Sequence, residues 1–407
     1  MNEGPIHELK TVSMPTYYLD HNATTPLAPR ALAAMNEAWS AGLGNASSQH
    51  GPGQQAAQDW RRWRDEIIGW LGGRTDCFPA DQLIVTSGGT ESNHLALWGL
   101  VDWHALTLGS RDVSPDNLVL SAMEHPSVGR SAAALAERFG LELRLVKPDR
   151  AGRIEAAELL RAVDDRTRLV SLMLAHNETG VIQPVKEVAD ACRARGIPVH
   201  CDAAQAVGKI AFSFRELSVT ALSFAAHKFH GPLGIGGLLI ESGRSLKPTW
   251  FGGFQQQGVR PGTEPLPLLA GMHAALGWYL EHQAPHVARL RQLRDSFEST
   301  LRAGCPEAVF LGADRDRLPN TSLVAFPGLD RQALVMAAGM AGVACSSGSA
   351  CASGSSEPSP TLLAMGVAPT LIGSAVRFSF GALQEPTEGD EAARLILNAV
   401  NNLSRWK

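Results

Sequence analysis

Residues 197–202, "IPVHCD", and 221–226, "ALSFAA", are two short apolar runs that each lead into residues capable of chemistry. The first run ends on Asp202, and the second continues into "HKFHGPLGIGG", which places Lys228 just after a strand. Similar apolar runs stand at 82–87, 117–122, 168–174 and 234–242, and helix-like sequence separates most of them. This alternation predicts βαβ units and a largely parallel sheet.

The rest of the chain predicts a second, smaller unit. A passage rich in Gly and Pro at 251–267 interrupts the alternation, and long helical segments follow at 268–304. Two more strand-like runs and a final helix lie between residue 321 and the C-terminus. We therefore expect an α/β protein with a large domain at 18–265 and a small α+β domain at 266–407, and we assign the N-terminal segment 1–17 to the small domain.

Composition argues against several classes of protein. The net charge is −4 and no block of Lys or Arg is present, which disfavours nucleic-acid binding. No apolar stretch is long enough to span a membrane and the N-terminus does not resemble a leader, so we expect a cytoplasmic protein. The 6 cysteines lack the spacing of a disulfide scaffold or a metal site, so we expect reduced thiols and no metal.

Ligands of open α/β sheets bind beyond the carboxyl ends of the strands, and four such positions carry suggestive residues. They are Gly89 and Thr90 after the run at 82–87, His125, Asp202 and Lys228. Each has a plain structural alternative: a glycine turn with a capping threonine, a surface histidine, a helix-capping aspartate and a lysine at the rim of the sheet. Their occurrence after successive strands favours one shared cofactor site.

Together with other motifs, these segments resemble the pyridoxal-phosphate-dependent cysteine desulfurases of the class V aminotransferase superfamily. The resemblance runs through "YLDHNATTP" (18–26), "GNASSQHGPG" (44–53), "TSGGTESNHLAL" (86–97), "MEHPSV" (123–128), "AHNETGVIQPV" (175–185), "HCDAAQAVGK" (200–209), "SFAAHKFHGPLGIGG" (223–237), "GVRPGTE" (258–264), "SSGSACASGSSEPSPTLLAMG" (346–366) and "AVRFSFG" (375–381). It implies fold type I of the pyridoxal phosphate enzymes, a homodimer, and conversion of L-cysteine to L-alanine.

The resemblance also implies roles around the cofactor ring. Lys228 would bind pyridoxal phosphate covalently and act as the base at the substrate Cα. Asp202 would pair with the pyridinium nitrogen, where it keeps the ring an electron sink. Gln205 would hydrogen-bond the phenolic oxygen, and His125 would stack on the ring and handle protons.

Further roles concern the phosphate and the substrate. Gly89, Thr90 and His227 would bind the phosphate, joined by Thr263 from the second subunit. Asn177 and Arg377 would position the amino acid, with Arg377 clamping its carboxylate.

Three departures from the family pattern stand out. Ala225 occupies a position where the family usually has a serine that donates to the phosphate, so cofactor retention is expected to be weaker unless another donor compensates. A glycine-rich "GGGQE" is replaced by "GGFQQ" at 252–256, and Leu233 stands where a lysine is common. These two changes affect the expected dimer-facing loop more than the chemistry.

The serine-rich stretch 345–360 contains two cysteines. Its composition is that of a flexible coil. Such a coil is typical of a linker whose cysteines have no role, and equally of a mobile loop that brings a reactive thiol to a substrate. The family's sulfur acceptor matches Cys351, whereas Cys345 matches no required thiol. A long cysteine loop of this kind implies direct delivery of sulfur to an acceptor protein.

Two other functions remain open from the sequence. One is another enzyme on the same scaffold, such as a selenocysteine lyase or an aminotransferase. The other is a binding or regulatory protein that keeps the fold without the chemistry.

Overall fold

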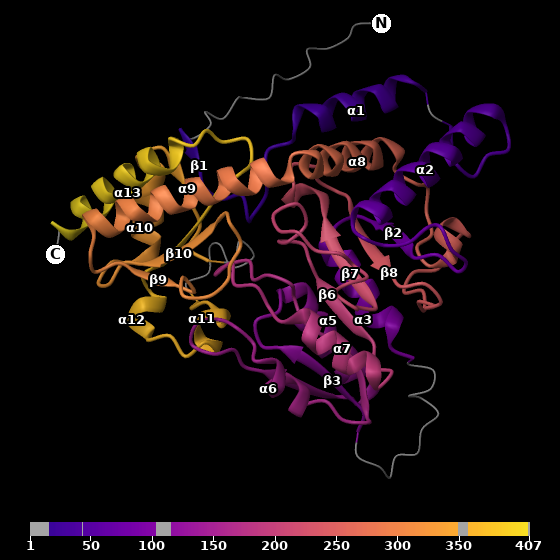
Figure 1. The fold of residues 1–407 in the computed structure, drawn as a ribbon, viewed down its shortest axis with the longest axis horizontal. Helices are drawn as coiled ribbons and strands as arrows, with labels where there is room; N and C mark the ends of the chain where they lie inside the picture. The colour runs from indigo at the N-terminus through magenta and orange to yellow at the C-terminus, as the bar shows by residue number, and fades with distance from the viewer. Residues whose placement is uncertain (1–15, 43, 103–114, 349–356, 406–407) are drawn as a thin grey trace, which may run out of the picture.

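The computed structural model describes residues 16–42, 44–102, 115–348 and 357–405, and its centre is a large mixed sheet (Figure 1). In this part of the chain the sheet has 7 strands in the order β2-β8-β7-β6-β5-β3-β4. They are β2 (Gln82–Thr86), β3 (Asn117–Ser121), β4 (Glu142–Val146), β5 (Thr167–Ser171), β6 (Val199–Asp202), β7 (Ala221–Ala225) and β8 (Gly236–Ile240). Only β8 runs antiparallel to its neighbours, so the prediction of a largely parallel sheet is confirmed.

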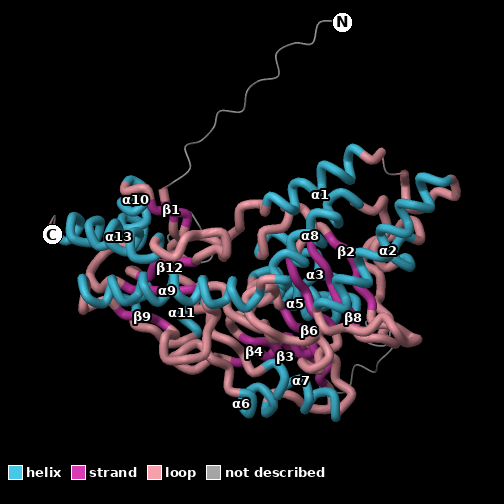
Figure 2. The backbone as a smooth tube through the Cα atoms, turned by 45° about the horizontal axis from the view of Figure 1, so that its top comes forward, coloured by secondary structure: helices cyan, strands magenta, loops and turns pink. Residues whose placement is uncertain are grey.

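Helices cover both faces of this sheet, as its apolar strands require. The covering helices are α2 (Gly51–Trp70), α3 (Gly89–Leu100), α5 (Pro126–Phe139), α6 (Ala156–Arg161), α7 (Val185–Ala194) and α8 (Leu266–Glu281). Alternate residues of one strand enter different cores: Leu118 and Leu120 pack with α3 and α5, and Val119 packs in the larger cluster on the opposite face. Leu159 of α6, Val188 of α7 and Leu269 of α8 belong to that larger cluster, so these helices lie on the face opposite α3 and α5. Figure 2 shows α6 and α7 at the bottom of the view and α1 near its top.

Two helices end close to the sheet. Gly196 follows α7 with φ of +70°, a left-handed conformation that glycine adopts without a Cβ penalty, and the helix ends just before it. Helix α3 ends at Leu100.

The remaining elements form smaller layers beside the large sheet. Strands β9 (Val309–Leu311), β10 (Thr321–Ala325) and β12 (Ala375–Ser379) make an antiparallel sheet, and β1 (Tyr17–Tyr18) pairs with β11 (Val343–Ala344). The other helices are α1 (Pro29–Ser40), α9 (Gln283–Gly304), α10 (Arg331–Met340), α11 (Pro360–Ala364), α12 (Pro369–Ile372) and α13 (Glu388–Ser404).

Helices α8 and α9 follow each other in the chain but pack in different places. Helix α8 packs against α1 and α2, whereas α9 packs against α13 and β10 (Figure 1). The domain boundary after residue 265 stays a prediction. Among the described helices, none combines the length and the apolar character that crossing a lipid bilayer demands.

Candidate active site

One cavity of about 240 Å³ lies at the carboxyl ends of β6 and β7. It gathers most of the residues that the sequence singled out: Gly89, Thr90, His125, Asn177, Asp202, Gln205, His227, Lys228 and Arg377. Asn22, Ala23, Asn93, Ser127, Met173, Ala175, Ala204 and Ala225 complete its lining. Segments that are far apart in the sequence therefore meet at one edge of the sheet.

Lys228 reaches this cavity from a short 3-10 turn that directly follows β7. Its Nζ donates to the backbone carbonyl oxygens of Asn22 at 2.6 Å and Ala23 at 2.7 Å. These carbonyls belong to the segment after β1, which crosses the end of the large sheet. The amine is thus held at the cavity wall by neutral acceptors.

Asp202 is the last residue of β6 and is buried, with 7% of its surface exposed. Its Oδ2 accepts a hydrogen bond from Asn93 Nδ2 at 2.8 Å, and its Oδ1 accepts one from the Ala204 N–H at 2.9 Å. A buried carboxylate with these two neutral donors is suited to bind a cationic nitrogen of a ligand. Nearby Glu124 is partly exposed, but its carboxyl Oε2 is buried, and this desolvation raises its pKa to about 8.

Two histidines of the cavity are held in their neutral form. His125 caps the N-terminus of α5, and burial lowers its pKa, an effect that Lys228 strengthens and Asp202 opposes. Burial, with a smaller contribution from Lys228 and Lys209, lowers the pKa of His227 to about 4. Near neutral pH both rings are therefore uncharged and offer one donor and one acceptor.

The N-terminus of α3 forms the end of the cavity that is best suited to an anion. The first N–H groups of a helix have no partner within the helix, and Gly89 and Thr90 occupy these positions. Gly88 precedes them with φ of +150°, in the region that glycine tolerates. Ala225 faces this turn, since a Cβ built on Gly89 would lie 3.5 Å from the Ala225 Cβ.

Arg377 lies on β12 and is buried, with only 1% of its surface exposed. Its Nη2 donates to Asp20 Oδ1 at 2.7 Å, and its Nη1 donates to the Asn177 carbonyl at 3.1 Å. Its Nε is buried and has no hydrogen-bond partner within the described part of the chain. Part of this guanidinium is therefore available for an anionic ligand such as a carboxylate.

The sequence did not single out some residues that shape the site. Asn22, Asn93 and Ser127 line the cavity, and Lys209 is buried behind it. The Lys209 ammonium donates to Gln205 Oε1 at 2.9 Å and to Asn22 Oδ1 at 3.3 Å, and burial lowers its pKa well below the ordinary value. Motifs quoted from the sequence contain all four residues, but their type alone gave no reason to prefer them to their neighbours.

Two predicted residues do not line this cavity in the described chain. Thr263 is exposed and lies in a separate depression beside Trp250 and Phe251, so its action across a dimer stays a prediction. Cys351 lies outside the described residues. Cys345 is described, and burial, with a smaller effect of Asp20, raises the pKa of its thiol to about 12.

The described residues on either side of segment 349–356 lie close to the cavity. Ser346 exchanges backbone hydrogen bonds with Arg377, at 2.7 and 3.2 Å. Beyond the segment, the Ser359 hydroxyl donates to Glu178 Oε2 at 2.8 Å, next in the chain to Asn177. A Cβ on Gly348 would also lie 3.2 Å from this carboxylate oxygen. Both flanks are thus fixed near the two residues expected to hold the substrate.

Comparison with known proteins agrees with this fold. The family model described as aminotransferase class-V matches residues 17–390. The chain is 37% identical to a cysteine desulfurase of Gluconacetobacter diazotrophicus over 93% of this chain and 91% of that protein. It is 38% identical to a cysteine desulfurase of Cereibacter sphaeroides, over 96% and 97% of the two chains.

A solved structure described as a NifS-like protein is also similar. It superposes with a TM-score of 0.85 at 30% identity, and the match covers 96% of this chain and 100% of that one. A match of this length includes the large sheet, the smaller layers beside it and the cavity that they share. The chain therefore belongs to the class-V aminotransferase family.

Proposed function

We propose that this protein is a pyridoxal-phosphate-dependent cysteine desulfurase. The observation that carries the proposal is the meeting of Lys228, Asp202 and Arg377 with the N-terminus of α3 around one cavity. Such a set offers an amine, a buried carboxylate, a guanidinium and an anion site. The relatives named as cysteine desulfurases cover nearly the whole chain, which supports the same reaction here.

The residues present fit pyridoxal phosphate. The α3 N-terminus with Gly88 and Gly89 suits its phosphate, and a side chain on Gly236 would collide with the Gly88 backbone at 2.8 Å. Asp202 suits its ring nitrogen, since a carboxylate opposite this nitrogen keeps it protonated. Asn93 Oδ1 is a further buried atom of the cavity wall without a partner among the described residues.

The proposed holding residues follow from this fit. Gly89, Thr90 and His227 would hold the phosphate, Asp202 the ring nitrogen, Gln205 the phenolic oxygen and Lys228 the aldehyde carbon. When bound, the cofactor would supply an electron sink that makes the Cα proton of an amino acid acidic and lets the electron pair of the Cβ–S bond stay on carbon when the sulfur is taken by a thiolate. Because Ala225 offers no hydroxyl, the phosphate receives one hydrogen bond fewer than a serine there would provide.

The remaining groups act on the substrate. Arg377 would bind the carboxylate of L-cysteine beside Asn177, and Lys228 would take the Cα proton and return a proton to the product. The Cys351 thiolate would attack the substrate sulfur, forming an S–S bond as the Cβ–S bond breaks. The balance is L-cysteine plus a Cys351 thiol giving L-alanine plus a Cys351 persulfide.

Two partners belong to the proposal. A second copy of the chain would contribute Thr263 to the phosphate site, and the exposed aromatic residues Phe251 and Phe254 of the same loop suit burial in such an interface. An acceptor protein would take the sulfur from Cys351.

The proposal is tested by the products formed from L-cysteine. With a reductant, the protein is expected to release alanine and sulfide in equal amounts, and Lys228→Ala is expected to release neither. Lys247→Ala serves as control, because this lysine is partly exposed and does not line the cavity. Formation of a keto acid instead of alanine would show an aminotransferase, and turnover of selenocysteine but not cysteine would show a selenocysteine lyase.

A further inference from the structure

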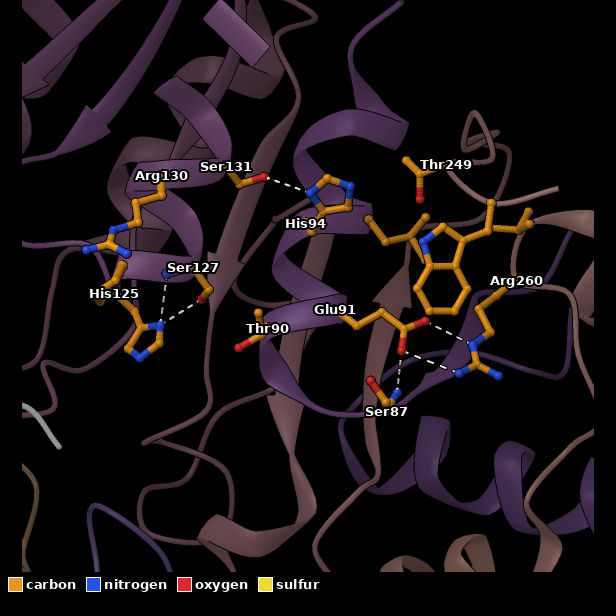
Figure 3. A pocket seen from close by; sticks show the side chains of 14 residues that line it. Ser87, Thr90, Glu91, His94, His125, Ser127, Arg130, Ser131, Thr249 and Arg260 are labelled. Carbon is orange, nitrogen blue, oxygen red and sulfur yellow. Dashed lines mark hydrogen bonds and ion pairs between the residues drawn. The ribbon is translucent and has the colours of Figure 1, made fainter. Parts of the chain in front are cut away.

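We propose that Asn93 and Ser127 are positioning residues that hold the neutral His125 ring with its proton on Nε2 and connect it to Asp202. This inference rests on the proposed function, because it assigns a role to the ring expected to lie on the cofactor. It concerns side chains from α3, α5 and β6 that contact one another directly. Figure 3 shows His125 and Ser127 at the first turn of α5.

The first step is the hydrogen bonding of His125 Nδ1. The backbone N–H of Ser127 points at this atom with an N···N distance of 3.2 Å, and the Ser127 Oγ lies 2.7 Å from it. A backbone N–H can only donate, so Nδ1 must be the acceptor. A neutral imidazole carries one proton, which is therefore on Nε2.

The second step is the direction of the Ser127 hydroxyl. Asn93 Nδ2 lies 2.9 Å from Ser127 Oγ and 2.8 Å from Asp202 Oδ2. The carboxylate can accept but not donate, which requires the amide NH₂ of Asn93 to face it. The second amide hydrogen then goes to Ser127 Oγ, and the hydroxyl hydrogen is left for His125 Nδ1.

The result is a chain of donors that runs from Asn93 in both directions. One branch ends on the Asp202 carboxylate, and the other passes through Ser127 to the imidazole. The Nδ1 lone pair is occupied by two donors, so the resting ring has no basic nitrogen to offer. His125 acts as a hydrogen-bond donor through Nε2, and the removal of the Cα proton falls to Lys228.

The same two helices hold a second serine and histidine that serve as a matched control. One turn further along α5, Ser131 Oγ lies 3.1 Å from His94 Nδ1 (Figure 3). The same oxygen lies 3.1 Å from Trp98 Nε1. The Trp98 N–H donates to Ser131 Oγ as the Asn93 amide donates to Ser127 Oγ. Trp98 makes no hydrogen bond to Asp202 among the described residues, so this second group is separate from the proposed network. Ser131→Ala removes a comparable contact without touching the proposed network.

The test is a two-bond ¹H–¹⁵N NMR spectrum of the full-length protein labelled at histidine, with and without added pyridoxal phosphate. The His125 signals are assigned by their absence from His125→Gln. The wild type is expected to show the neutral Nε2–H form near neutral pH. In Ser127→Ala, loss of one donor to Nδ1 should raise the proton affinity of His125 about fivefold.

Three single variants, and one double variant of Asn93 and Ser127, make the result specific. Ser127→Thr keeps the hydroxyl and should restore the wild-type proton affinity, whereas Ser131→Ala should leave it unchanged. Asn93→Ala should change it in the same direction as Ser127→Ala, and the double variant should add little, because both act through one chain. An Nδ1–H form in the wild type, or a Ser127→Ala spectrum equal to the wild type, would overturn the inference.

The readout is independent of turnover. A protein that forms no alanine but shows the expected His125 signals would disprove the proposed function and keep the network. A protein that forms alanine but whose His125 ring carries its proton on Nδ1 would support the proposed function and disprove the network.

Discussion

Replacing Ala225 by serine should tighten cofactor binding. Ala225 ends β7, is buried with 2% of its surface exposed, and faces the N-terminal turn of α3 where the phosphate is proposed to bind. A serine here adds a hydroxyl donor next to Gly89. The substitution restores the residue type that the resembling family usually has.

The size of the effect follows from the burial of this position. A hydrogen bond to a charged group contributes about 1.5–3 kcal/mol, and fixing and desolvating the hydroxyl consumes part of that. We therefore expect about tenfold tighter binding of pyridoxal phosphate, equivalent to about 1.4 kcal/mol. In the cofactor-free protein the added hydroxyl has no anion to bind, so Ala225→Ser should lower the free energy of unfolding by about 1 kcal/mol.

The assay is titration of cofactor-free protein with pyridoxal phosphate, followed by absorbance, alongside urea unfolding with and without the cofactor. Ala226→Ser is the matched control, because Ala226 is the next residue, is fully buried and does not line the cavity. It should destabilise the protein without tightening binding. Equal or weaker cofactor affinity in Ala225→Ser would refute the assignment of the phosphate to the α3 turn.

Three further predictions concern single side chains. Cys345→Ala should keep the rate of sulfide release within about twofold of the wild type. Iodoacetamide should alkylate Cys345 only slowly near neutral pH, because a pKa of about 12 leaves about one thiolate in 10⁵ molecules. Rapid alkylation of Cys345 would contradict this prediction. Glu124 has a pKa of about 8 in the folded protein and about 4.5 in the unfolded chain. Between these two pH values only the folded protein keeps the proton, so the free energy of unfolding is highest below pH 4.5 and falls as the pH rises toward 8. Glu124→Gln should remove this decline of a few kcal/mol in urea unfolding; parallel pH profiles of the two proteins would count against it. Arg377→Lys keeps a positive charge beside Asp20 but loses the planar guanidinium that can bind a carboxylate through two hydrogen bonds. KM for L-cysteine should therefore rise at least about tenfold, with the affinity for pyridoxal phosphate unchanged. An unchanged KM would show that Arg377 does not bind the substrate.

The sequence predicted the strand-end residues well because their signal is local. Asp202 and Lys228 each follow an apolar strand, and adjacent parallel strands bring their carboxyl ends together, as the pairing of Asp202 with Ser223 on β7 shows. The strands themselves were predicted from short apolar runs, such as those at 117–122 and 221–226. Strand β4 was not predicted, because Glu142 and Arg144 make it read as a polar segment, which suits its place at the sheet edge.

Residues that enter the site through tertiary packing could not be predicted in this way. Asn22 reaches the cavity because the segment after β1 crosses the end of β7, a path that no local pattern records. Asn93 lies one helical turn beyond Gly89, but its contact with Asp202 depends on how α3 packs over β6. The polar chain from Asp202 to His125 becomes visible only when three elements are assembled.

The most direct test of the proposed reaction is a single exposure of the protein to L-cysteine without reductant, followed by mass analysis of its cysteine-containing peptides and measurement of alanine. We predict one added sulfur atom on the peptide with Cys351 for each alanine formed, and neither product in Lys228→Ala. Alanine formed without sulfur on Cys351, or sulfur bound to another cysteine in a fully active Cys351→Ala protein, would contradict the account.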